Sequence, residues 1–405
     1  MTATRLAHGL LAGGLLLIAG TLAYTFVPVQ IGIGFAVLGW VILGFTEGRW
    51  RYRRHLFFVP LLFYLGWNFL SAALSVRPLH TLYAVVNNEW ALLILLMMYW
   101  NLDRLRDLNR LVYTLLLTSA PAMVFAVWQI FYGGRLHRTP PLSPMGRFYR
   151  AVGFHGFYLT FAGFALAVFF LAGAHFLLRR ERVRWWFAGL AALSLAAMIG
   201  TFARSIWLSL AAAVPVAGFV RGRKTGLIVS GAGVVLALVG LYGSSAIRDR
   251  AASILDLSQN ETRLNLWKTA EHIARDHPLL GIGEDNWVCF FPRYRVPGNY
   301  DVAMHPHNDY LNVLVNSGVP GLISFLALWV LALREAWRGC RPLRDDRARA
   351  TALGAGLALL GLLIGGFFQN YYGTFMNCLE WWLLVGLIFA AGKAEAGGGV
   401  TGLPT

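Results

Sequence analysis

Long apolar runs separated by short polar connections dominate the chain. Each run is close to the length of about 20 residues that a helix needs to cross a lipid bilayer. The sequence predicts twelve spans, near residues 9–24, 29–46, 56–75, 82–100, 111–132, 155–178, 185–200, 205–220, 225–243, 310–333, 350–369 and 374–391. We interpret the first run as an uncleaved span rather than a signal peptide, because the alternation of charged connections requires it.

One connection, residues 244–306, is much longer than the others and has a pattern of its own. Apolar residues recur at helical spacing through 261–276, which predicts an amphipathic helix with Asn260 as its N-cap. The sequence HPLLGIGEDNW at 277–287 predicts a tight glycine-rich turn, and 288–304 reads as aromatic and irregular. We therefore expect a folded cap rather than a linker.

A polar cluster stands directly before the tenth apolar run. It consists of His305, His307, Asn308 and Asp309, and the run itself contains Gly318, Pro320 and Gly321. Titratable groups at the mouth of a membrane segment are costly unless they are used, and histidine exchanges protons near neutral pH. Pro320 is expected to kink the helix, and the glycines to permit close backbone approach. The alternative is that these residues only cap the helix.

Composition agrees with a polytopic membrane protein, since 57% of the residues are hydrophobic and 13% are charged. A net charge of +16 would suggest nucleic acid in a soluble protein. Here the basic residues lie mostly in short connections, so no nucleic-acid partner is expected. Three widely spaced cysteines, Cys289, Cys340 and Cys378, indicate neither a disulfide framework nor a zinc site.

With the N-terminus in the cytoplasm, 22 of the 35 basic residues fall in cytoplasmic connections, as the positive-inside rule requires. Most exceptions gather on the outside in two segments: 133–154 holds Arg135, Arg138, Arg147 and Arg150, and 244–306 holds Arg248, Arg250, Arg263, Lys268, Arg275, Arg293 and Arg295. Arg77 and Arg204 stand in short outside turns. They predict an anionic ligand there. A long loop escapes the charge rule, which is the alternative explanation, but Arg150 and Arg204 sit at span boundaries. Arg263 opposes the dipole of the 261–276 helix unless it shares an anion with free N–H groups.

Two motifs carry a family resemblance. His307, Asn308, Gly318 and Gly321 form an HN motif followed after nine residues by GxxG. Residues 262–283, TRLNLWKTAEHIARDHPLLGIG, resemble an R-x3-W…HPLLG-x-G loop. Together with the topology, they resemble the O-antigen ligase/polymerase superfamily of bacterial inner-membrane glycosyltransferases. Length and the lack of an added C-terminal domain are most similar to the O-antigen ligases.

The resemblance implies an all-α polytopic membrane protein of GT-C type, with about twelve transmembrane helices and one large helical periplasmic loop. The expected division is 1–243 for spans one to nine, 244–309 for the periplasmic loop and motif, 310–391 for the last three spans, and 392–405 for a disordered cytoplasmic tail. The implied location is the bacterial inner membrane, with the active site facing the periplasm.

The implied activity is transfer of the O-antigen glycan from undecaprenyl pyrophosphate to lipid A–core oligosaccharide in lipopolysaccharide biosynthesis. We expect His307 to activate the acceptor hydroxyl, with His305 as the rival base. Forked arginine donors match phosphate oxygens, so the donor pyrophosphate is assigned to Arg204 and Arg263, then to Arg150 and Arg147. No DxD motif lies on the outside, so an inverting transferase without metal or other cofactor is expected. Asn308, Gly318 and Gly321 are supporting residues.

Several alternatives stay open. The chain could be an O-antigen polymerase or a protein O-oligosaccharyltransferase of the same superfamily, or a transporter of lipid-linked glycan. Glu89 and Glu380 lie within spans and are interpreted as buried structural partners for arginines rather than parts of a cavity. The aromatic residues Trp287, Phe290, Phe291 and Tyr294 either line a groove or, as we favour, form the core of the loop.

Overall fold

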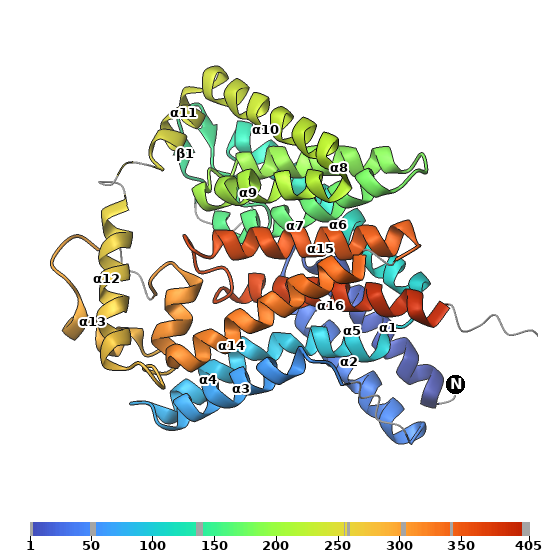
Figure 1. The fold of residues 1–405 in the computed structure, drawn as a ribbon, viewed down its shortest axis with the longest axis horizontal. Coiled ribbons are helices and arrows are strands. Elements are labelled where there is room, and N and C mark those ends of the chain that lie inside the picture. The colour runs from blue at the N-terminus through green and yellow to red at the C-terminus, as the bar shows by residue number, and fades with distance from the viewer. Residues whose placement is uncertain are drawn as a thin grey trace, which may run out of the picture.

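A computed structural model describes residues 3–48, 54–134, 141–254, 256, 260–300, 305–340 and 343–398. The fold is a bundle of helices with one small hairpin (Figure 1). The helices are α1 Ala3–Thr21, α2 Phe26–Thr46, α3 Phe58–Ala73, α4 Pro78–Glu89, α5 Leu93–Asn101, α6 Leu105–Tyr132, α7 Tyr158–Leu178, α8 Arg184–Ile199, α9 Arg204–Arg221, α10 Arg223–Gly243, α11 Ser245–Ala252, α12 Glu261–Asp276, α13 Trp287–Tyr294, α14 Asp309–Cys340, α15 Asp346–Gly365 and α16 Phe375–Gly398. The hairpin pairs β1, Pro144–Met145, with β2, Phe148–Tyr149.

All twelve predicted apolar runs are helical, but not all are long enough for a simple span. Eight helices of the described chain have the length and apolar character to cross a membrane, and α3, α8 and most of α9 are shorter apolar helices. The run at 82–100 is divided by a 3-10 turn, Trp90–Leu92, between α4 and α5. The protein is thus a polytopic helical membrane protein, and the count of twelve spans stays a prediction.

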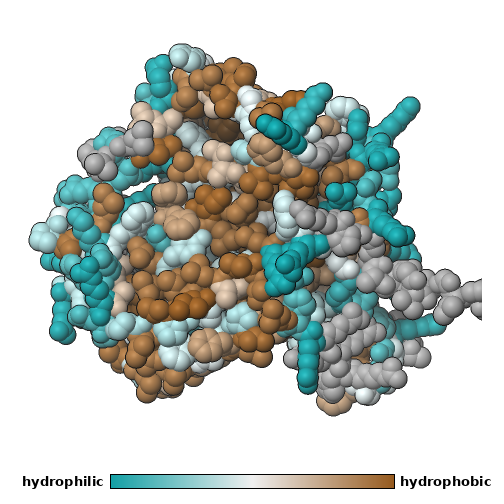
Figure 2. Space-filling model, viewed as in Figure 1, coloured by the Kyte–Doolittle hydropathy of each residue, from teal (hydrophilic) through white to brown (hydrophobic). Residues whose placement is uncertain are grey.

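The bundle has two polar ends with an apolar band between them. Figure 2 shows hydrophilic residues at the left and right edges and hydrophobic residues across the middle. Helices α11, α12 and α13 lie at the left edge, whereas the N-terminus lies at the right (Figure 1). We call the edge that carries α11–α13 the capped end, and the other the opposite end.

The folded cap has a core of its own. Leu266, Ala270 and Ile273 of α12 pack with Trp287 in a cluster separate from the main core of the bundle. The other aromatic residues predicted to form this core, Phe290, Phe291 and Tyr294, pack against the same cluster. The prediction that these residues form the core of the loop is therefore confirmed.

Three local expectations need correction. Asn260 precedes α12 as expected, but its side chain makes no N-cap bond; its amide instead donates to backbone carbonyls, the nearest being that of Asp256 at 2.8 Å. Part of the segment expected to be irregular, 287–294, is the helix α13. The tail expected to be disordered from residue 392 is helical up to Gly398, because α16 continues without a break. Residues 399–405, like Arg135 and Arg138, lie outside the described part of the chain.

Candidate functional site

A sharp break in α14 lets the long loop approach the bundle. Gly318 has φ 68° and ψ −172°, which ends one helical segment and begins another. The predicted kink at Pro320 is wrong, because the break lies before the proline. Pro320 then falls in the first turn of the second segment, where its missing N–H removes no helical hydrogen bond.

The glycine-rich turn predicted at 277–287 lies along this break. Three backbone hydrogen bonds of 2.8 to 3.0 Å join them, from Ile282 to Val315, from Gly283 to Asn316 and from Val319 to Pro278. A Cβ at Gly318 would collide with the backbone of Leu279. These contacts explain the first glycine of the GxxG motif, Gly318, since glycine alone tolerates both the positive φ and the close approach.

Helix α3 satisfies the carbonyl groups that the break exposes. Trp67 Nε1 donates to the Ser317 carbonyl at 3.0 Å. Ser71 Oγ donates to the Leu280 carbonyl at 2.6 Å, and it lies 3.1 Å from that of Asn316. Buried backbone acceptors require such partners. The break is thus a built feature that fixes the start of α14 and, with it, the histidine motif.

His307 is held in an unusual backbone conformation at the start of α14. Its φ is 51°, in the left-handed region that few non-glycine residues adopt. His305 Nδ1 accepts the His307 N–H at 3.2 Å, and the two rings stand edge to face with centroids 4.5 Å apart. Burial, with a contribution from His307, lowers the pKa of His305 to about 4. A neutral His305 is therefore available to orient His307 by accepting this bond.

The neighbours of His307 fasten the motif to the loop between α15 and α16. His307 Nδ1 lies 3.2 Å from Gln369 Oε1. Asn308 Oδ1 accepts from Leu311 N–H at 3.0 Å, and its Nδ2 donates to the Phe367 carbonyl at 3.0 Å. Of the roles considered for Asn308, the helix cap is the one its contacts fit.

Asp309 forms a second link to the same loop. Its carboxylate oxygens accept from the backbone N–H groups of Tyr371, at 3.1 Å, and Tyr372, at 2.9 Å. Tyr371 Oη lies 2.9 Å from Ser205 Oγ, one residue after Arg204. This chain of contacts joins the histidine motif to the start of α9.

Helix α12 reaches the motif from the other side. Trp267 Nε1 donates to the Pro306 carbonyl at 3.0 Å, between the two histidines. Arg263 lies one turn before Trp267, and residues four apart share a helix face. Burial raises the pKa of Tyr371, and the nearby Arg263 guanidinium opposes that rise. Arg263 thus faces the same region as Arg204.

Four arginines from three separate segments gather here. Burial, together with the nearby guanidinium groups of Arg150, Arg204 and Arg263, lowers the pKa of Arg250 to about 10. Three of them contact neutral groups, and Arg204 also interacts electrostatically with Asp256. Arg204 donates to the Ser253 carbonyl, Arg250 Nε donates to the Phe202 carbonyl at 3.0 Å, and the Arg150 guanidinium lies 4.1 Å from the centre of the Tyr158 ring. We call Arg150, Arg204, Arg250 and Arg263 the arginine cluster.

The predicted site residues are mostly, but not wholly, brought together. Arg147 lies on the β1–β2 hairpin with its guanidinium 4.9 Å from the centre of the Phe148 ring, and none of its contacts tie it to the arginine cluster. Arg250 was one of several basic residues of the long loop and no pattern distinguished it. Gln369 carried no signal at all, because its role arises from a contact with His307 across two helices.

Glu89 and Glu380 were expected to pair with arginines, but their hydrogen bonds are with neutral groups. Glu89 Oε2 accepts from Tyr372 Oη at 2.7 Å, and Glu380 Oε2 accepts from Asn377 Nδ2 at 3.1 Å. Another carboxylate, Glu284, is half-buried within the glycine-rich turn and was not predicted. Its oxygens accept from Asn88 at 3.1 Å and from Asn316 at 2.7 Å, and burial raises its pKa to about 7.

Arg77 and the expected supporting residue Gly321 both have structural roles. Arg77 Nε donates to Asn286 Oδ1 at 2.9 Å, and its Nη2 to the Asp285 carbonyl at 2.6 Å, which ties down the end of the glycine-rich turn. At Gly321 a Cβ would collide with the Ser317 side chain one turn earlier. Within the described ranges, no three His, Cys, Asp or Glu side chains lie together as a metal site would require.

The fold and the site together define a polytopic helical membrane protein whose polar site lies at one end, beneath a folded loop. Residues 189–326 match the O-antigen ligase family, and this range contains both sequence motifs. An O-antigen ligase of Pseudomonas aeruginosa is 29% identical over 170 residues, which are 42% of this chain and 35% of that protein. The match thus spans about a third of the relative. The chain is thus similar to O-antigen ligases over part of its length.

A similarity to a solved structure is weaker. A chain in a peptidoglycan synthase complex is similar with a TM-score of 0.46 and 14% sequence identity, over 84% of this chain and 97% of that chain. This TM-score is too low to show a shared fold.

Proposed function

We propose that the protein transfers a glycan from a polyprenyl pyrophosphate to an acceptor sugar hydroxyl, and that it acts as an O-antigen ligase with lipid A–core as acceptor. The observation that carries the proposal is the arginine cluster beside the histidine motif. A lipid-linked pyrophosphate needs fixed cations, and forked guanidinium groups match its oxygens. The acceptor hydroxyl needs a proton acceptor near neutral pH, and His307 is one.

In the proposed step, the acceptor oxygen attacks the anomeric carbon of the donor sugar. The bond between that carbon and the pyrophosphate oxygen breaks, and polyprenyl pyrophosphate leaves with both electrons. His307 takes the proton of the attacking hydroxyl, while the arginine cluster holds the charge that develops on the leaving oxygen. Attack opposite the leaving group inverts the anomeric centre. No metal ion takes part in the proposal.

His305 and Gln369 are positioning residues in this scheme. His305 accepts the His307 N–H and so supports its positive φ, and Gln369 fixes one ring nitrogen of His307. In the proposal, the other ring nitrogen of His307 takes the proton of the acceptor hydroxyl. A base held by two contacts loses less entropy when the reacting atoms align.

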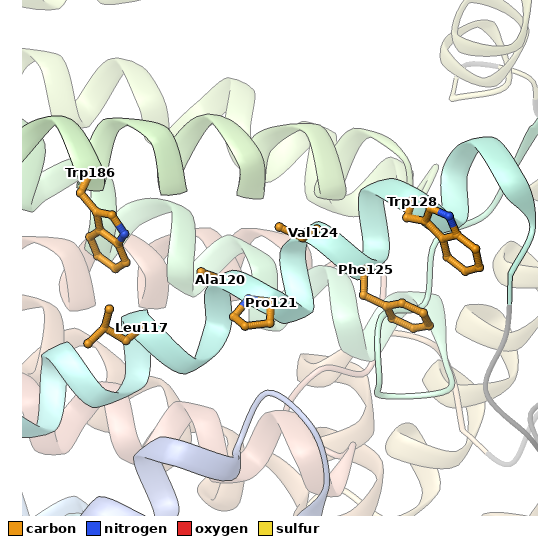
Figure 3. A pocket seen from close by; sticks show the side chains of 7 residues that line it. All are labelled: Leu117, Ala120, Pro121, Val124, Phe125, Trp128 and Trp186. Atoms are coloured by element: carbon orange, nitrogen blue, oxygen red, sulfur yellow. The ribbon is translucent and has the colours of Figure 1, made fainter.

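A groove on the membrane face of α6 suits the donor's hydrocarbon chain. It has a volume of about 820 Å³ and is lined by Trp186 of α8 and by six residues that follow α6 toward the capped end, Leu117, Ala120, Pro121, Val124, Phe125 and Trp128 (Figure 3). Pro121 interrupts the helical bonding and leaves a hollow. Beyond Trp128, Phe131 packs on Phe148 with ring centres 5.9 Å apart, on the hairpin that leads to Arg150.

Transfer by the purified protein tests the proposal. Lipid-linked glycan and rough lipopolysaccharide should yield glycan-bearing lipopolysaccharide, and activity should survive excess EDTA. A requirement for added magnesium or manganese would contradict the metal-free mechanism.

A deletion strain separates ligase from polymerase. Without a ligase, rough lipopolysaccharide and long lipid-linked glycan accumulate. Single glycan units attached to core would instead identify the chain as a polymerase.

A further inference from the structure

A second groove combines apolar walls with cations at the opposite end of the bundle. It lies between α9, α14 and α15 and has a volume of about 650 Å³. Its apolar lining includes Val216, Phe219, Val330 and Leu353, and its basic lining is Arg334, Arg338 and Arg349. Val330 and Phe219 are 63% and 49% exposed, so the groove opens to the surroundings of the bundle.

The apolar and basic residues are sorted along the groove. On α14, Val330, Arg334 and Arg338 follow one another at intervals of four, so they share a helix face that changes from apolar to cationic toward the opposite end. The step from Val330 to Arg338 covers about 12 Å along the axis. Helix α15 begins at Asp346 and runs the other way, and its Arg349 precedes Leu353 by one turn. Both helices therefore place their cations at the same end of the groove.

The floor of the groove depends on close packing of α14 and α15. A Cβ at Gly356, which lines the groove, would press on Ala336 Cβ. Trp337 stands at the level of the arginines and is 45% exposed. Tryptophan is typical of the boundary between hydrocarbon and headgroups. The groove thus runs from the apolar band of the bundle to a polar boundary.

Nearby carboxylates are directed to other partners. Glu335 lies 3.8 Å from His55 Nε2, on the neighbouring α3 side. Asp345 Oδ1 accepts from the N–H groups of Arg347, at 2.8 Å, and Ala348, at 2.9 Å, and so caps α15. Among the described residues that line the groove there are three arginines and no aspartate or glutamate, so the lining of its basic end suits an anion.

We propose that this groove binds an anionic phospholipid from the leaflet at the opposite end of the bundle. Its phosphate would lie against Arg334, Arg338 and Arg349, and one acyl chain would lie along Val216, Phe219 and Val330. Basic pockets between transmembrane helices at the cytoplasmic side bind anionic headgroups in this manner. The site is separate from the arginine cluster and does not depend on the proposed transferase activity.

Native mass spectrometry of the full chain in mild detergent tests the proposal. Titration with phosphatidylglycerol should give one tightly bound lipid, and phosphatidylcholine should bind at least about tenfold more weakly, since only the former carries net charge. The triple variant Arg334→Gln, Arg338→Gln and Arg349→Gln should bind phosphatidylglycerol at least about tenfold more weakly. A matched control, Arg180→Gln, Arg182→Gln and Arg184→Gln, removes the same charge at the same end and should bind as the unchanged protein does.

A further variant probes the chain-binding part. Val216→Trp fills the apolar half while keeping all three arginines, and should also weaken phosphatidylglycerol. Each variant is first shown to elute as a single species and to keep its unfolding temperature in lipid-free detergent. Equal binding of the two lipids, or equal loss in the control triple variant, would overturn the proposal. Unchanged binding of phosphatidylglycerol to Val216→Trp would also overturn the proposal, because headgroup contacts alone would then explain the binding.

Discussion

Two sets of arginines, one at each end of the bundle, have different partners. At the opposite end, Arg347 lies 3.0 Å from Glu181, and Arg179 bonds the same carboxylate as well as Tyr113. The hydrogen bonds from Arg347 and then Arg179 lower the pKa of Glu181. In the arginine cluster at the capped end, the arginines instead lie close to one another and contact carbonyls, a hydroxyl and a ring, with Asp256 as a nearby carboxylate of Arg204.

The difference separates a structural use of charge from a functional one. Arginines that share a carboxylate gain stability from it and need no further partner. Arginines kept close together repel one another, and burial adds a desolvation cost, as the lowered pKa of Arg250 reflects. Strongly perturbed groups of this kind cluster at functional sites. We interpret the arginine cluster as a site for a multiply charged anion that removes this repulsion on binding.

The largest expected effect is on turnover at the capped end. His307→Ala should lower the rate of transfer by about 10²–10⁴-fold, because a general base contributes that much. His272→Ala removes an exposed histidine from α12 and should leave the rate unchanged. Rates are compared in the assay with purified components. A His307→Ala enzyme with nearly full activity would move the base elsewhere, first to His305.

Substitution of Arg263 tests the role of the arginine cluster at the capped end. Arg263→Ala should weaken donor binding by roughly 10- to 100-fold, since a charge-assisted hydrogen bond is worth about 1.5–3 kcal/mol. Arg263→Lys should recover only part, because a point charge cannot make the forked contact. Arg275→Ala on the same helix is the control, as Arg275 is exposed and pairs with Glu271 at 2.6 Å. Equal losses for Arg263→Ala and Arg275→Ala would show a general charge effect.

Glu284 is a carboxylate of the capped end that pairs with amides rather than arginines. Its folded pKa, about 7, lies above the usual 4.5, so its neutral form is favoured in the fold. The stability this provides is complete below pH 4.5 and is lost as pH rises through 7. Glu284→Gln cannot ionise at this position. Its unfolding temperature should therefore change less with pH between pH 5 and 8 than that of the unchanged protein. Identical pH slopes for both proteins would contradict the assignment.

The smallest expected effect is at the paired end. Glu181→Gln should lower the free energy of unfolding by about 1 kcal/mol or less, since the carboxylate is half-exposed and such pairs are weak. Donor binding should not change. The lowered pKa of Glu181 implies a contribution present at neutral pH and lost as pH falls below about 4.5. A loss of donor binding in this variant would contradict the division between the two ends.

Much of the fold could be predicted because hydrophobic patterns report local structure. Residues 261–276 are helical over the predicted range, and every apolar run is a helix, since one face of each must be buried in protein or lipid. The break in α14 could not be placed from the sequence. Proline suggested position 320, whereas the backbone bonds of the distant turn at 278–283 put the break at Gly318.

Site residues whose type or position was unusual could be predicted from the sequence, whereas those placed only by tertiary contacts could not. Arg150, Arg204 and Arg263 stood out because each opposes a local rule of charge placement. Arg250 stood among many basic residues of a long loop, and its place beside the other three arises only from tertiary packing. Gln369 and His305 contact His307 and are proposed to act through it, and no local pattern signals such a role.

Binding of a polyprenyl pyrophosphate to matched variants tests the central claim most directly. The claim is that His307 activates the acceptor whereas the arginine cluster holds the donor. Isothermal titration should show nearly unchanged affinity for His307→Ala and a roughly 10- to 100-fold loss for Arg263→Ala, with both proteins folded. If His307→Ala loses donor binding as severely as Arg263→Ala does, His307 is a donor ligand and the proposed division of roles is wrong.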